Sequence, residues 1–392
     1  MVHFKKKVLI ISPYFYPNIE WGGPVTVTLN LVRELKNNGY HVQVLTTNVS
    51  KYGKIPYRNS KIIDGVKVTY AESVFPILAW RFRIFISVDQ ILKGWRIIPR
   101  FDIVHFQDTF ILQNIFLAAR CRALNIPYII TPHGSLSFSR ERGKSTMKRF
   151  FVYLLSGKYL SESSNIIAVS ESEKESIERD FECLKNKTVY IPNIIRIENF
   201  MRMDIRSKLN IPKDDIILLS LSRICHLKGV VELASGFLKY LRKYSAKATL
   251  IFAGPDMGAV NEIKRLLKGS KFSNKFIFTG EVAGDFKLNL INCSDIVCLL
   301  SKSESMPTVI LEAASFAKPI ICTRECNVDD LVNWGGALLT SRKVEDIAMT
   351  INLLSLKRAR LEIGRKAKKW FDKRYNILNI INQYKIIYAN AK

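Results

Sequence analysis

Short apolar segments alternate along this chain with longer amphipathic segments, which is the pattern of a parallel β-sheet covered by helices. In the first half, strands are predicted at residues 8–12, 42–46, 66–70, 103–107, 128–131, 166–169 and 189–191, with helices such as 26–37 and 110–124 between them. In the second half, strands are predicted at 216–222, 248–253, 276–279, 296–300 and 319–323, with helices near 230–243, 259–268 and 308–316. The chain is therefore expected to have an α/β fold.

A segment with few periodic apolar residues, 192–212, separates the two halves. The 392 residues are too many for one ordinary domain. They suit two domains of about 150–200 residues, each able to bury a core. We place the domain boundary near residues 193–199 and expect the C-terminal segment 357–391 to be helical.

The segment SESMPTVILEAA, residues 303–314, holds two glutamates eight positions apart around a proline and an apolar run. A helix that begins near Pro307 would carry Glu312 one or two turns in, and Glu304 would lie in the loop ahead of it. The loop amides after Glu304 would then lie at the positive end of the helix, where an anion binds, with a carboxylate on either side to accept hydrogen bonds from hydroxyl groups. The alternative is an ordinary amphipathic helix with two solvated glutamates.

Basic residues follow the predicted strand at 216–222. Arg223 and Lys228 lie in SRICHLKG, just before a helical pattern. Arginine can bind two phosphate oxygens at once and lysine supplies a point charge, so a strand end with both is typical of a diphosphate site. The alternative is a chance pair of surface cations, which is common in so basic a protein.

Two loops in the first half carry further candidate ligands. Gly22 and Gly23 follow the first strand and precede a helix, where a backbone without Cβ atoms lets a phosphate approach closely. A plain turn ahead of the helix is the alternative. His133 directly follows the strand at 128–131 in Pro-His-Gly. A single loop histidine is more often structural than catalytic, but ligands of open α/β sheets bind at strand carboxyl ends, which favours function here.

Eight segments carry a resemblance to a known family in their order and spacing: SPYFYPNIEWGG (12–23), TPHG (131–134), AVSESEK (168–174), IPN (191–193), SRICHLKG (222–229), FAGPD (252–256), FTGEV (278–282) and ESMPTVILEA (304–313). With them the chain resembles the retaining glycosyltransferases of glycosyltransferase family 4, also called glycosyl transferases group 1. The resemblance implies the GT-B fold, with two facing Rossmann-like domains and an interdomain cleft. It also implies an acceptor-binding domain at 1–195, a nucleotide-sugar-binding domain at 196–370 and a C-terminal helix at 371–392 that crosses back to the first domain.

The resemblance further implies transfer of a sugar from a UDP- or GDP-sugar with retention of the anomeric configuration. Arg223 and Lys228 would stabilise the leaving phosphate, while Glu304 and His133 would contact the transferred sugar. The remaining candidates for donor binding are Gly22, Gly23, Ser305, Met306, Pro307, Thr308 and Glu312. Among them the Gly23 amide would approach the leaving phosphate and Glu312 would bind the ribose hydroxyls.

Family 4 enzymes are thought to work without a carboxylate nucleophile, so the resemblance implies that the acceptor attacks from the leaving-group face and the phosphate takes its proton. An Asp-x-Asp pair, which often holds a divalent ion in metal-dependent sugar transfer, does not occur in the sequence. We therefore expect a metal-independent hexosyltransferase with no cofactor besides its donor. The chain departs from the family at Met306, where Phe is usual, at Ile194, where Gly is common, and at 322–332, where CTRECNVDDLV replaces a Gly-Gly-x-x-Glu run.

Net charge is a second strong signal, because 60 Lys and Arg against 34 Asp and Glu give a formal charge of +26. Residues 51–150 hold 17 basic and 6 acidic side chains, and residues 351–392 hold 11 and 2. Within 75–100, aromatic side chains alternate with basic ones: Phe75, Trp80, Phe82, Phe85 and Trp95 with Arg81, Arg83, Lys93, Arg96 and Arg100. This mixture is typical of docking on an anionic membrane surface. Nucleic-acid binding, or core aromatics beside solvated cations, are the alternatives.

Compartment signals point to the cytoplasm. No window of about 18 uncharged apolar residues is present, so no membrane-spanning helix is expected. The N-terminal apolar run is short and lacks a small-residue cleavage site. Seven cysteines without a Cys-x-x-Cys pair suggest reduced thiols. We expect a peripheral protein on the inner face of the cell membrane.

The leading hypothesis is a retaining glycosyltransferase that acts on a lipid-linked oligosaccharide or glycolipid in surface polysaccharide or lipopolysaccharide biosynthesis, and that does not bind nucleic acid. A non-hydrolysing nucleotide-sugar epimerase shares the two-domain fold but would need acid and base side chains around the sugar. A basic nucleic-acid-binding protein would instead show a steep salt dependence and no affinity for nucleotide sugars.

Overall fold

The computed structural model describes residues 6–50, 53–57, 59–76, 79, 84–136, 157–197 and 199–392. The chain forms two compact units. The first contains Met1–Ile194 together with Ile377–Lys392, and the second contains Ile195–Asn376. The first unit thus ends one residue before the expected boundary at 195, and the chain returns to it at residue 377 rather than at 371.

The first unit is built on a parallel sheet with one antiparallel edge strand, in the order β10-β9-β8-β7-β1-β2-β6-β5. Its strands are β1 (Lys7–Ile11), β2 (His41–Thr47), β5 (Ser60–Ile63), β6 (Val66–Ala71), β7 (Ile103–Gln107), β8 (Tyr128–Thr131), β9 (Asn165–Ala168) and β10 (Thr188–Tyr190). A separate short hairpin pairs β3 (Val49–Ser50) with β4 (Gly53–Lys54). The central strand β1 is apolar and almost fully buried, as expected for a sheet covered on both faces.

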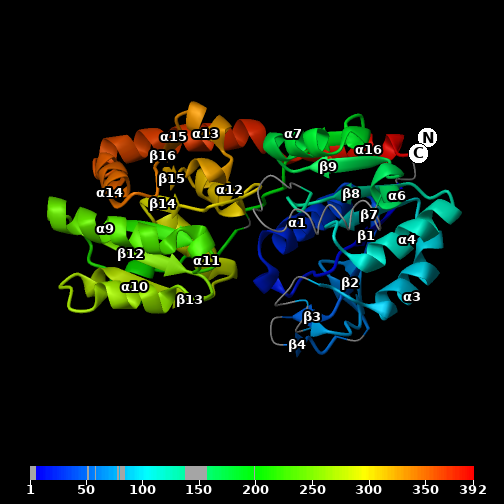
Figure 1. The fold of residues 1–392 in the computed structure, drawn as a ribbon, viewed down its shortest axis with the longest axis horizontal. Helices are drawn as coiled ribbons and strands as arrows, with labels where there is room; N and C mark the ends of the chain where they lie inside the picture. The colour runs from blue at the N-terminus through cyan, green and yellow to red at the C-terminus, as the bar shows by residue number, and fades with distance from the viewer. Residues whose placement is uncertain are drawn as a thin grey trace. The chain divides into compact units, whose positions relative to one another are not determined.

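Helices cover both faces of this sheet (Figure 1). They are α1 (Gly23–Asn37), α3 (Val88–Ile97), α4 (Leu112–Ala123), α6 (Gly157–Ser161), α7 (Glu171–Asp180) and α16 (Ile377–Asn390). In β7, Val104 and Phe106 pack with Leu117 of α4. His105 lies between them and points to the opposite face, where its Nδ1 is 2.8 Å from the Tyr388 hydroxyl of α16. The C-terminal helix therefore completes the cover of the first sheet.

The strand order of the first unit reverses between β1 and β7. From β1 the chain adds β2 and β6 on one side, and then returns to add β7, β8, β9 and β10 on the other. Loops that leave two neighbouring parallel strands in opposite directions open a crevice at the carboxyl ends of those strands. The loops after β1 and β7 flank this point.

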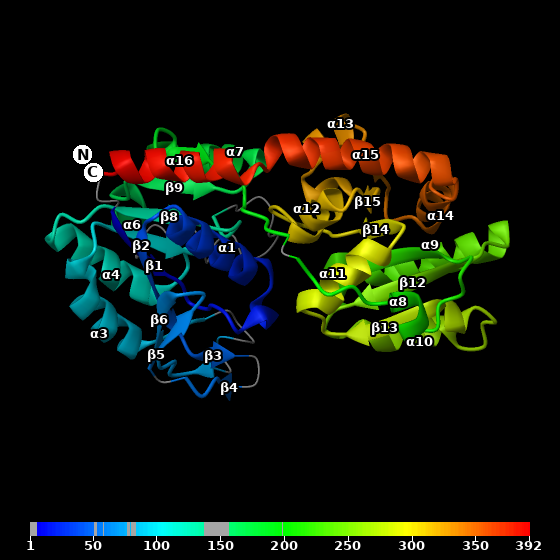
Figure 2. The same ribbon diagram turned by 180° about the vertical axis from the view of Figure 1, so that it is seen from behind.

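The second unit repeats this arrangement with a parallel sheet in the order β13-β12-β11-β14-β15-β16. Figure 2 labels β12, β13, β14 and β15 of this sheet. Its strands are β11 (Ile216–Leu221), β12 (Ala248–Ala253), β13 (Phe276–Gly280), β14 (Ile296–Leu299), β15 (Ile320–Cys322) and β16 (Ala337–Leu339). Its helices are α8 (Ile205–Lys208), α9 (Val230–Tyr244), α10 (Val260–Leu267), α11 (Gly284–Cys293), α12 (Thr308–Ser315), α13 (Asp329–Asn333), α14 (Val344–Leu353) and α15 (Lys357–Arg374). The order reverses between β11 and β14, so the loops after these two strands flank the second crevice.

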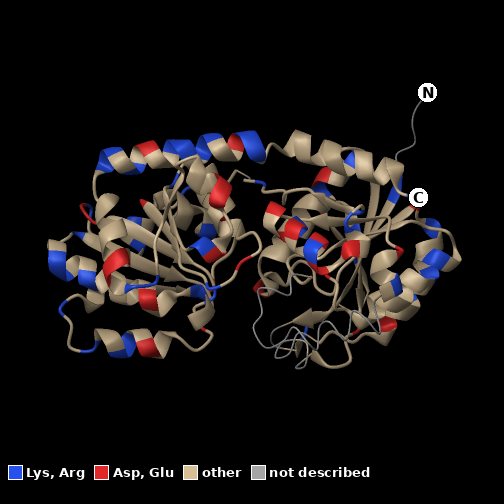
Figure 3. Cartoon of the chain, turned by 45° about the horizontal axis from the view of Figure 1, so that its top comes forward, with Lys and Arg blue, Asp and Glu red and all other residues tan. Residues whose placement is uncertain are grey.

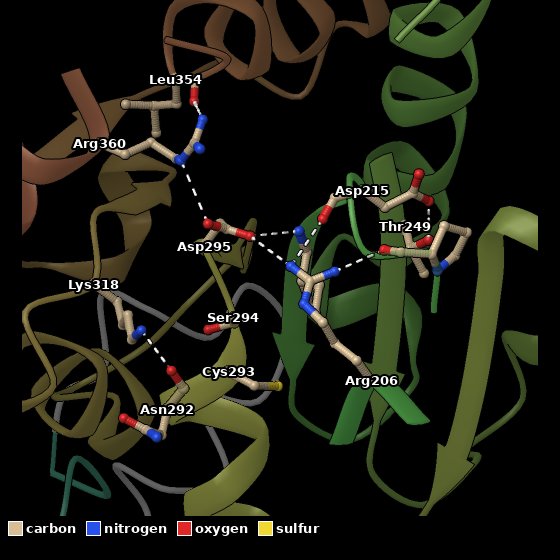
Figure 4. Close-up of polar contacts among 12 residues, drawn as sticks. Arg206, Asp215, Thr249, Asn292, Cys293, Ser294, Asp295, Lys318, Leu354 and Arg360 are labelled. Carbon is tan, nitrogen blue, oxygen red and sulfur yellow. Dashed lines mark hydrogen bonds and ion pairs between the residues drawn. The ribbon is translucent and has the colours of Figure 1, made fainter. Parts of the chain in front are cut away.

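A polar network joins the amino-terminal edge of the second sheet to its surroundings (Figure 4). Asp295, just before β14, accepts the Ile217 N–H at 2.9 Å and lies 3.6 Å from one guanidinium nitrogen of Arg206 and from one of Arg360. Arg206 belongs to α8 and Arg360 to α15, so one carboxylate anchors both helices to the sheet. The expected linker at 192–212 therefore includes a helix that is part of the second unit, and the opposite, carboxyl edge of the sheet is left for ligands.

Candidate functional site

The loop after β11 in the second unit lies against the end of β14. It contains a 3₁₀ turn, η5 (His226–Lys228), which ends at Gly229 with a left-handed φ of 64°. A Cβ atom on Gly229 would lie 2.1 Å from the Leu300 carbonyl oxygen, so only glycine fits both the backbone angle and the close approach. The Leu227 carbonyl also accepts the Lys302 N–H at 2.8 Å. These contacts hold the two loops of the crevice together.

Lys228 and Glu304 form an ion pair across this crevice. The Lys228 ammonium donates to Glu304 Oε1, which also accepts the Ser301 hydroxyl at 2.6 Å. The two side chains are only 15% and 13% exposed, so the pair is sequestered from solvent. Within the described part of the chain, no group donates to Glu304 Oε2. The expected phosphate-binding cation and the expected sugar-binding carboxylate are therefore neighbours, and that carboxylate keeps a free acceptor.

The loop after β15 fixes the backbone on either side of Glu304. Glu325, in the 3₁₀ turn η7 (Arg324–Cys326), accepts the Glu304 N–H through its carbonyl at 3.0 Å. The Asn327 side-chain amide donates to the Glu304 carbonyl at 2.5 Å, and Thr323 donates its hydroxyl to the Ser301 carbonyl at 2.6 Å. The segment CTRECN, residues 322–327, thus positions Glu304 through a backbone carbonyl and through the side chain of Asn327.

Glu312 is buried in α12, with 5% of its surface exposed. Its Oε1 accepts from the Lys287 ammonium of α11 at 2.6 Å, whereas its buried Oε2 has no hydrogen-bond partner among the described residues. A buried carboxylate oxygen without a partner loses its hydration, so the site favours a ligand that donates a hydrogen bond to it. The alternative of two solvated glutamates is wrong, since both Glu304 and Glu312 are withdrawn from solvent.

The amino end of α12 presents unpaired backbone donors next to these carboxylates. The helix begins at Thr308 with Pro307 as its N-cap, close to the predicted start. In the described residues, the N–H groups of Ser305, Met306 and Thr308 have no acceptor. Free N–H groups at a helix start attract an anion. The Met306 sulfur meanwhile accepts from the Tyr375 hydroxyl at 3.6 Å, which holds this apolar side chain against the second unit.

Arg223 follows β11 by two residues and lies at the same sheet edge as Lys228. Its side chain is half-buried, and it makes no ion pair with any residue that the structure describes. Lys228, by contrast, is paired with Glu304. Arg223 remains an uncommitted cation next to the crevice.

Gly22 and Gly23 start the first helix of the first unit. Gly22 has a φ of 89°, a backbone conformation that residues with a side chain rarely adopt. It is the N-cap residue of α1, whose first residue is Gly23. A Cβ atom on Gly22 would meet no atom within 4 Å, so the backbone angle rather than crowding selects glycine here. This geometry allows either the phosphate contact or the plain turn considered above.

His133 lies just past β8 with a left-handed φ of 52°. Its Nε2 is 2.8 Å from Gln107 Oε1, which can only accept, so Nε2 carries the proton and Nδ1 is the unprotonated nitrogen. Burial lowers the pKa of His133 to about 4, although the nearby Asp108 carboxylate opposes that shift. The imidazole is therefore neutral at physiological pH, which suits hydrogen bonding to a sugar rather than charge stabilisation.

Glu173 holds the loop that carries His133. Fully buried in α7, it accepts the Gly134 N–H on Oε1 and the Val169 N–H on Oε2, the latter at 2.8 Å. Its own N–H donates to Ser170 Oγ at 3.1 Å. This residue was not predicted, although the Ser-x-x-Glu spacing of a capping box in AVSESEK is a sequence signal that could have found it.

We predict that the first unit loses stability in mild acid. Burial lowers the pKa of His105 to about 3 and that of His133 to about 4, both from 6.5. Below pH 6.5 these histidines are protonated in the unfolded chain but stay neutral in the folded chain. Their contribution to the free energy of unfolding is therefore complete above pH 6.5 and is lost as the pH falls toward the folded-state pKa values. Each histidine should lower the free energy of unfolding by about 1.4 kcal/mol per pH unit in this window.

Denaturant titrations at roughly pH 7, 6 and 5 measure this slope. In the His105→Gln variant the slope should be shallower by about 1.4 kcal/mol per pH unit, because one of the two depressed groups is gone. An equal slope in the variant and the parent would contradict the assignment to His105.

The aromatic and basic segment at 75–100 divides in the structure. Residues 77–78 and 80–83, with Trp80, Arg81, Phe82 and Arg83, lie outside the described residues. The basic segment 140–149, which is also expected to face the lipid surface, lies outside them too. Phe85 was expected at a surface, but it is 4% exposed and its ring packs 5.4 Å from that of Tyr14 and 5.2 Å from that of Trp21. That expectation is wrong because these rings form a local core. Trp95 and Phe75, by contrast, are exposed.

The structure thus brings Lys228, Glu304 and the start of α12 together around one crevice of the second unit, with Arg223 and Glu312 at the same sheet edge. Gly22, Gly23 and His133 lie at the carboxyl edge of the first unit. Residues that the sequence did not predict are Ser301, Lys287 and Asn327, which no local pattern marks. Among the described residues, no group of three or more His, Cys, Asp or Glu side chains could hold a metal ion.

Two doubly wound Rossmann-like units, the second with free helix amides beside cations and a buried carboxylate, define the GT-B class of fold. The family models agree: the description "Glycosyltransferase Family 4" matches residues 21–199 and "Glycosyl transferases group 1" matches residues 201–370. The chain belongs to this family of glycosyltransferases.

Curated relatives are similar over most of their length. Alpha-monoglucosyldiacylglycerol synthase of Streptococcus pneumoniae is 26% identical over 83% of this chain and 73% of its own. N-acetyl-alpha-D-glucosaminyl L-malate synthase of Bacillus anthracis is 24% identical over 96% of this chain and 95% of its own. Among solved structures, Anabaena HepE in complex with UDP and glucose superposes with a TM-score of 0.75 at 16% identity, covering 98% of this chain and 100% of that chain. This likeness confirms the GT-B fold.

Proposed function

We propose that this protein is a retaining, metal-independent hexosyltransferase that moves a sugar from a UDP- or GDP-sugar to a lipid-linked oligosaccharide or glycolipid. The reaction would serve surface polysaccharide synthesis at the inner face of the cell membrane. The single observation that carries the proposal is the buried, unpartnered Oε2 of Glu312, next to a helix start with free amides. A nucleoside diphosphate supplies both the ribose hydroxyl and the anion that these groups lack.

The donor phosphates would bind through the N–H groups of Ser305, Met306 and Thr308 and through the side chains of Arg223 and Lys228. Lys228 is paired with Glu304. A diphosphate carries more negative charge than one carboxylate, so it would draw the ammonium toward itself. Glu304 would then have both oxygens available to accept hydroxyl hydrogen bonds from the transferred sugar. The ion pair thus joins the two side chains that would act on the donor.

In the reaction, the bond between the anomeric carbon and the leaving phosphate oxygen breaks and a bond from the acceptor oxygen to that carbon forms. Negative charge builds on the leaving phosphate, where fixed cations lower the barrier. The acceptor proton passes to the phosphate oxygen on the same face. In this reaction no side chain of the protein acts as the nucleophile. We therefore assign Glu304 to binding the transferred sugar.

The relatives support the finer parts of the proposal. Anabaena HepE has been solved with UDP-glucose, which supports a uridine diphosphate donor. The name of alpha-monoglucosyldiacylglycerol synthase includes that of a glycolipid. A putative teichuronic acid biosynthesis glycosyltransferase of Bacillus subtilis is 27% identical over 53% of this chain. Both names favour an acceptor of the cell envelope. Among the described residues, none of the helices combines the length and the hydropathy needed to span a bilayer.

An exposed apolar face on α3 and α4 supports peripheral docking. Val88, Leu92 and Trp95 are 56%, 55% and 44% exposed and recur at helical spacing on one side of α3. On α4, Leu112 and Phe116 are exposed in the same way. Cations surround this face: the Arg120 guanidinium lies 5.2 Å from the centroid of the Trp95 ring, and Arg96 and Arg100 are exposed. An apolar helix face bordered by cations suits the interface of an anionic bilayer. We name this the α3–α4 face.

We predict that the protein sediments with vesicles containing anionic lipid, is released by salt, and depends on the α3–α4 face for binding. Trp95→Ser and Leu92→Ser should each weaken vesicle binding by about 10-fold at unchanged net charge, because an apolar side chain no longer enters the lipid. Co-sedimentation at fixed lipid concentration measures this.

The matched control is Leu356→Ser. Leu356 is 69% exposed and stands beside Lys357 and Arg358 at the start of α15, a helix in which Lys and Arg are concentrated (Figure 3). Its loss should leave vesicle binding unchanged. If all three variants bound vesicles equally, the attraction between protein and lipid would be purely electrostatic. That result would favour an acceptor that is not in the membrane.

Thermal denaturation with a panel of nucleotide sugars tests the proposed function. A true donor at 100 times its dissociation constant should stabilise the protein by about 2.7 kcal/mol, while the same sugars without nucleotide should not. EDTA should leave the stabilisation intact. A panel in which no UDP- or GDP-sugar raises the melting temperature would contradict the proposal.

A further inference from the structure

The crevice of the first unit holds a bridging pair that the donor site does not use. Tyr14 follows β1 and Asp108 follows β7, the two strands at which the order reverses. The Tyr14 hydroxyl donates to Asp108 Oδ2 at 3.2 Å. This pair spans the crevice of the first unit as Lys228 and Glu304 span that of the second. Asp108 is therefore where a ligand of the first sheet would bind.

The backbone at this edge is held in uncommon conformations. Asp108 has a φ of 70°, and His133, at the end of the neighbouring strand β8, has a φ of 52°. Left-handed residues other than glycine are uncommon and cluster at ligand sites, where the surrounding structure stabilises them. The Thr109 N–H donates to Asp108 Oδ1 at 2.8 Å and fixes the direction of the carboxylate.

The side chains at this edge can accept more hydrogen bonds than they receive. A carboxylate has about four acceptor positions, and the described residues donate one bond to each Asp108 oxygen. The side chain is half-buried rather than enclosed. Nearby, the neutral His133 keeps Nδ1 as an acceptor. The negative charge of Asp108 repels phosphate, and the acceptors on Asp108 and His133 suit a neutral ligand with hydroxyl donors, such as a sugar ring or a glycerol headgroup.

An aromatic stack orients the donor of the bridging pair. The ring of Tyr14 is stacked on that of Trp21 with centroids 5.3 Å apart and an interplanar angle of 8°. Trp21 ends the 3₁₀ turn η1 (Ile19–Trp21) directly before Gly22. Both rings are buried, so the direction of the Tyr14 hydroxyl is set by packing. Tyr14 can therefore position the Asp108 carboxylate without touching the ligand.

We propose that Asp108 binds the acceptor: its carboxylate accepts a hydrogen bond from a hydroxyl of a neutral sugar or glycerol acceptor, and Tyr14 is its positioning residue. This assignment rests on the proposed function and adds the chemical class of the acceptor group. It predicts that loss of the Asp108 charge weakens the use of acceptor while nucleotide binding, which belongs to the second unit, stays the same.

The test uses UDP-glucose as donor and octyl β-D-glucopyranoside as acceptor with the full chain. Asp108→Asn keeps a residue that tolerates left-handed backbone and can still accept the Thr109 N–H, but it removes the charge. Its kcat/KM for octyl glucoside should fall by about 10- to 100-fold, since hydrogen bonds to charged groups contribute about 1.5–3 kcal/mol. The UDP dissociation constant from calorimetry should stay within about two-fold of the parent. Tyr14→Phe should lower kcat/KM in the same direction by a smaller factor.

Asp102→Asn is the matched control. Asp102 lies directly before β7, whereas Asp108 lies directly after it. Like Asp108, Asp102 accepts a backbone N–H, that of Lys7 at 2.6 Å. This variant should match the parent in kcat/KM. The assignment is overturned if Asp108→Asn keeps its kcat/KM, or if its UDP affinity falls in parallel, which would mark a general structural defect. A parent chain that binds no nucleotide would instead overturn the proposed function itself.

Discussion

Replacing Lys228 with alanine is expected to lower kcat by about 10²–10³-fold, because the leaving phosphate loses a fixed positive charge as its own negative charge develops. The change also leaves Glu304 with the Ser301 hydroxyl as its remaining donor. The fold should persist, because the apolar core of the second unit is made by other residues. Steady-state turnover of the donor found by thermal screening measures the effect.

Lys239→Ala is the control for this prediction. Lys239 lies on α9 and is paired with Glu345 of α14, so the variant removes another lysine from a lysine–glutamate pair of the same unit. Its kcat should equal that of the parent. Near-full activity of Lys228→Ala would remove the phosphate role from this residue, whatever the control shows.

Changing Glu312 to glutamine is expected to weaken binding of the nucleoside diphosphate by about 10- to 100-fold. The hydrogen bond from a ribose hydroxyl to a carboxylate would become one to a neutral amide, and bonds to charged groups contribute about 1.5–3 kcal/mol. Since the ribose does not react, this contact is present in the ground state and in the transition state alike, so kcat should change little. Titration calorimetry with UDP and GDP measures the dissociation constants.

Glu304→Gln supplies the contrast. Its effect should fall on turnover and on the choice of sugar, while UDP affinity stays near that of the parent. Lys287→Met tests the neighbour of Glu312: it removes the ion pair but keeps the carboxylate, so UDP binding should fall less than in Glu312→Gln. If Glu312→Gln bound UDP as tightly as the parent, the ribose contact would have to be assigned elsewhere.

The strands of both sheets could be predicted closely, and those predictions are confirmed. Every predicted strand is present, with each end within one residue of the observed position. The reason is physical: strands of a parallel sheet are buried on both faces and appear as short apolar runs between polar loops. The strands that were not predicted lack this signal. β5, for example, is an edge strand whose residues are largely exposed.

The site was less accessible to sequence reasoning. Arg223, Lys228, Glu304 and Glu312 stand in recognisable segments next to predicted strand ends or helix starts, so their positions could be predicted. The partners that orient them could not. Lys287 meets Glu312 over a separation of 25 residues, and Asn327 meets Glu304 over 23. Such contacts depend on how α11 and the loop after β15 pack, and no local pattern encodes that packing.

The return of α16 to the first unit gives the chain an order of assembly. The second unit is one continuous segment, so it is complete once Asn376 has left the ribosome during synthesis. The first unit is complete only after residues 377–392 have been made. Until they arrive, His105 lacks the hydroxyl of Tyr388, and Lys6 lacks the carbonyl groups of Tyr388 and Ala389 that its ammonium binds. A nonsense mutation within the codons for α16, or proteolytic loss of this helix, would therefore damage the first unit, whose sheet is synthesised before the second unit.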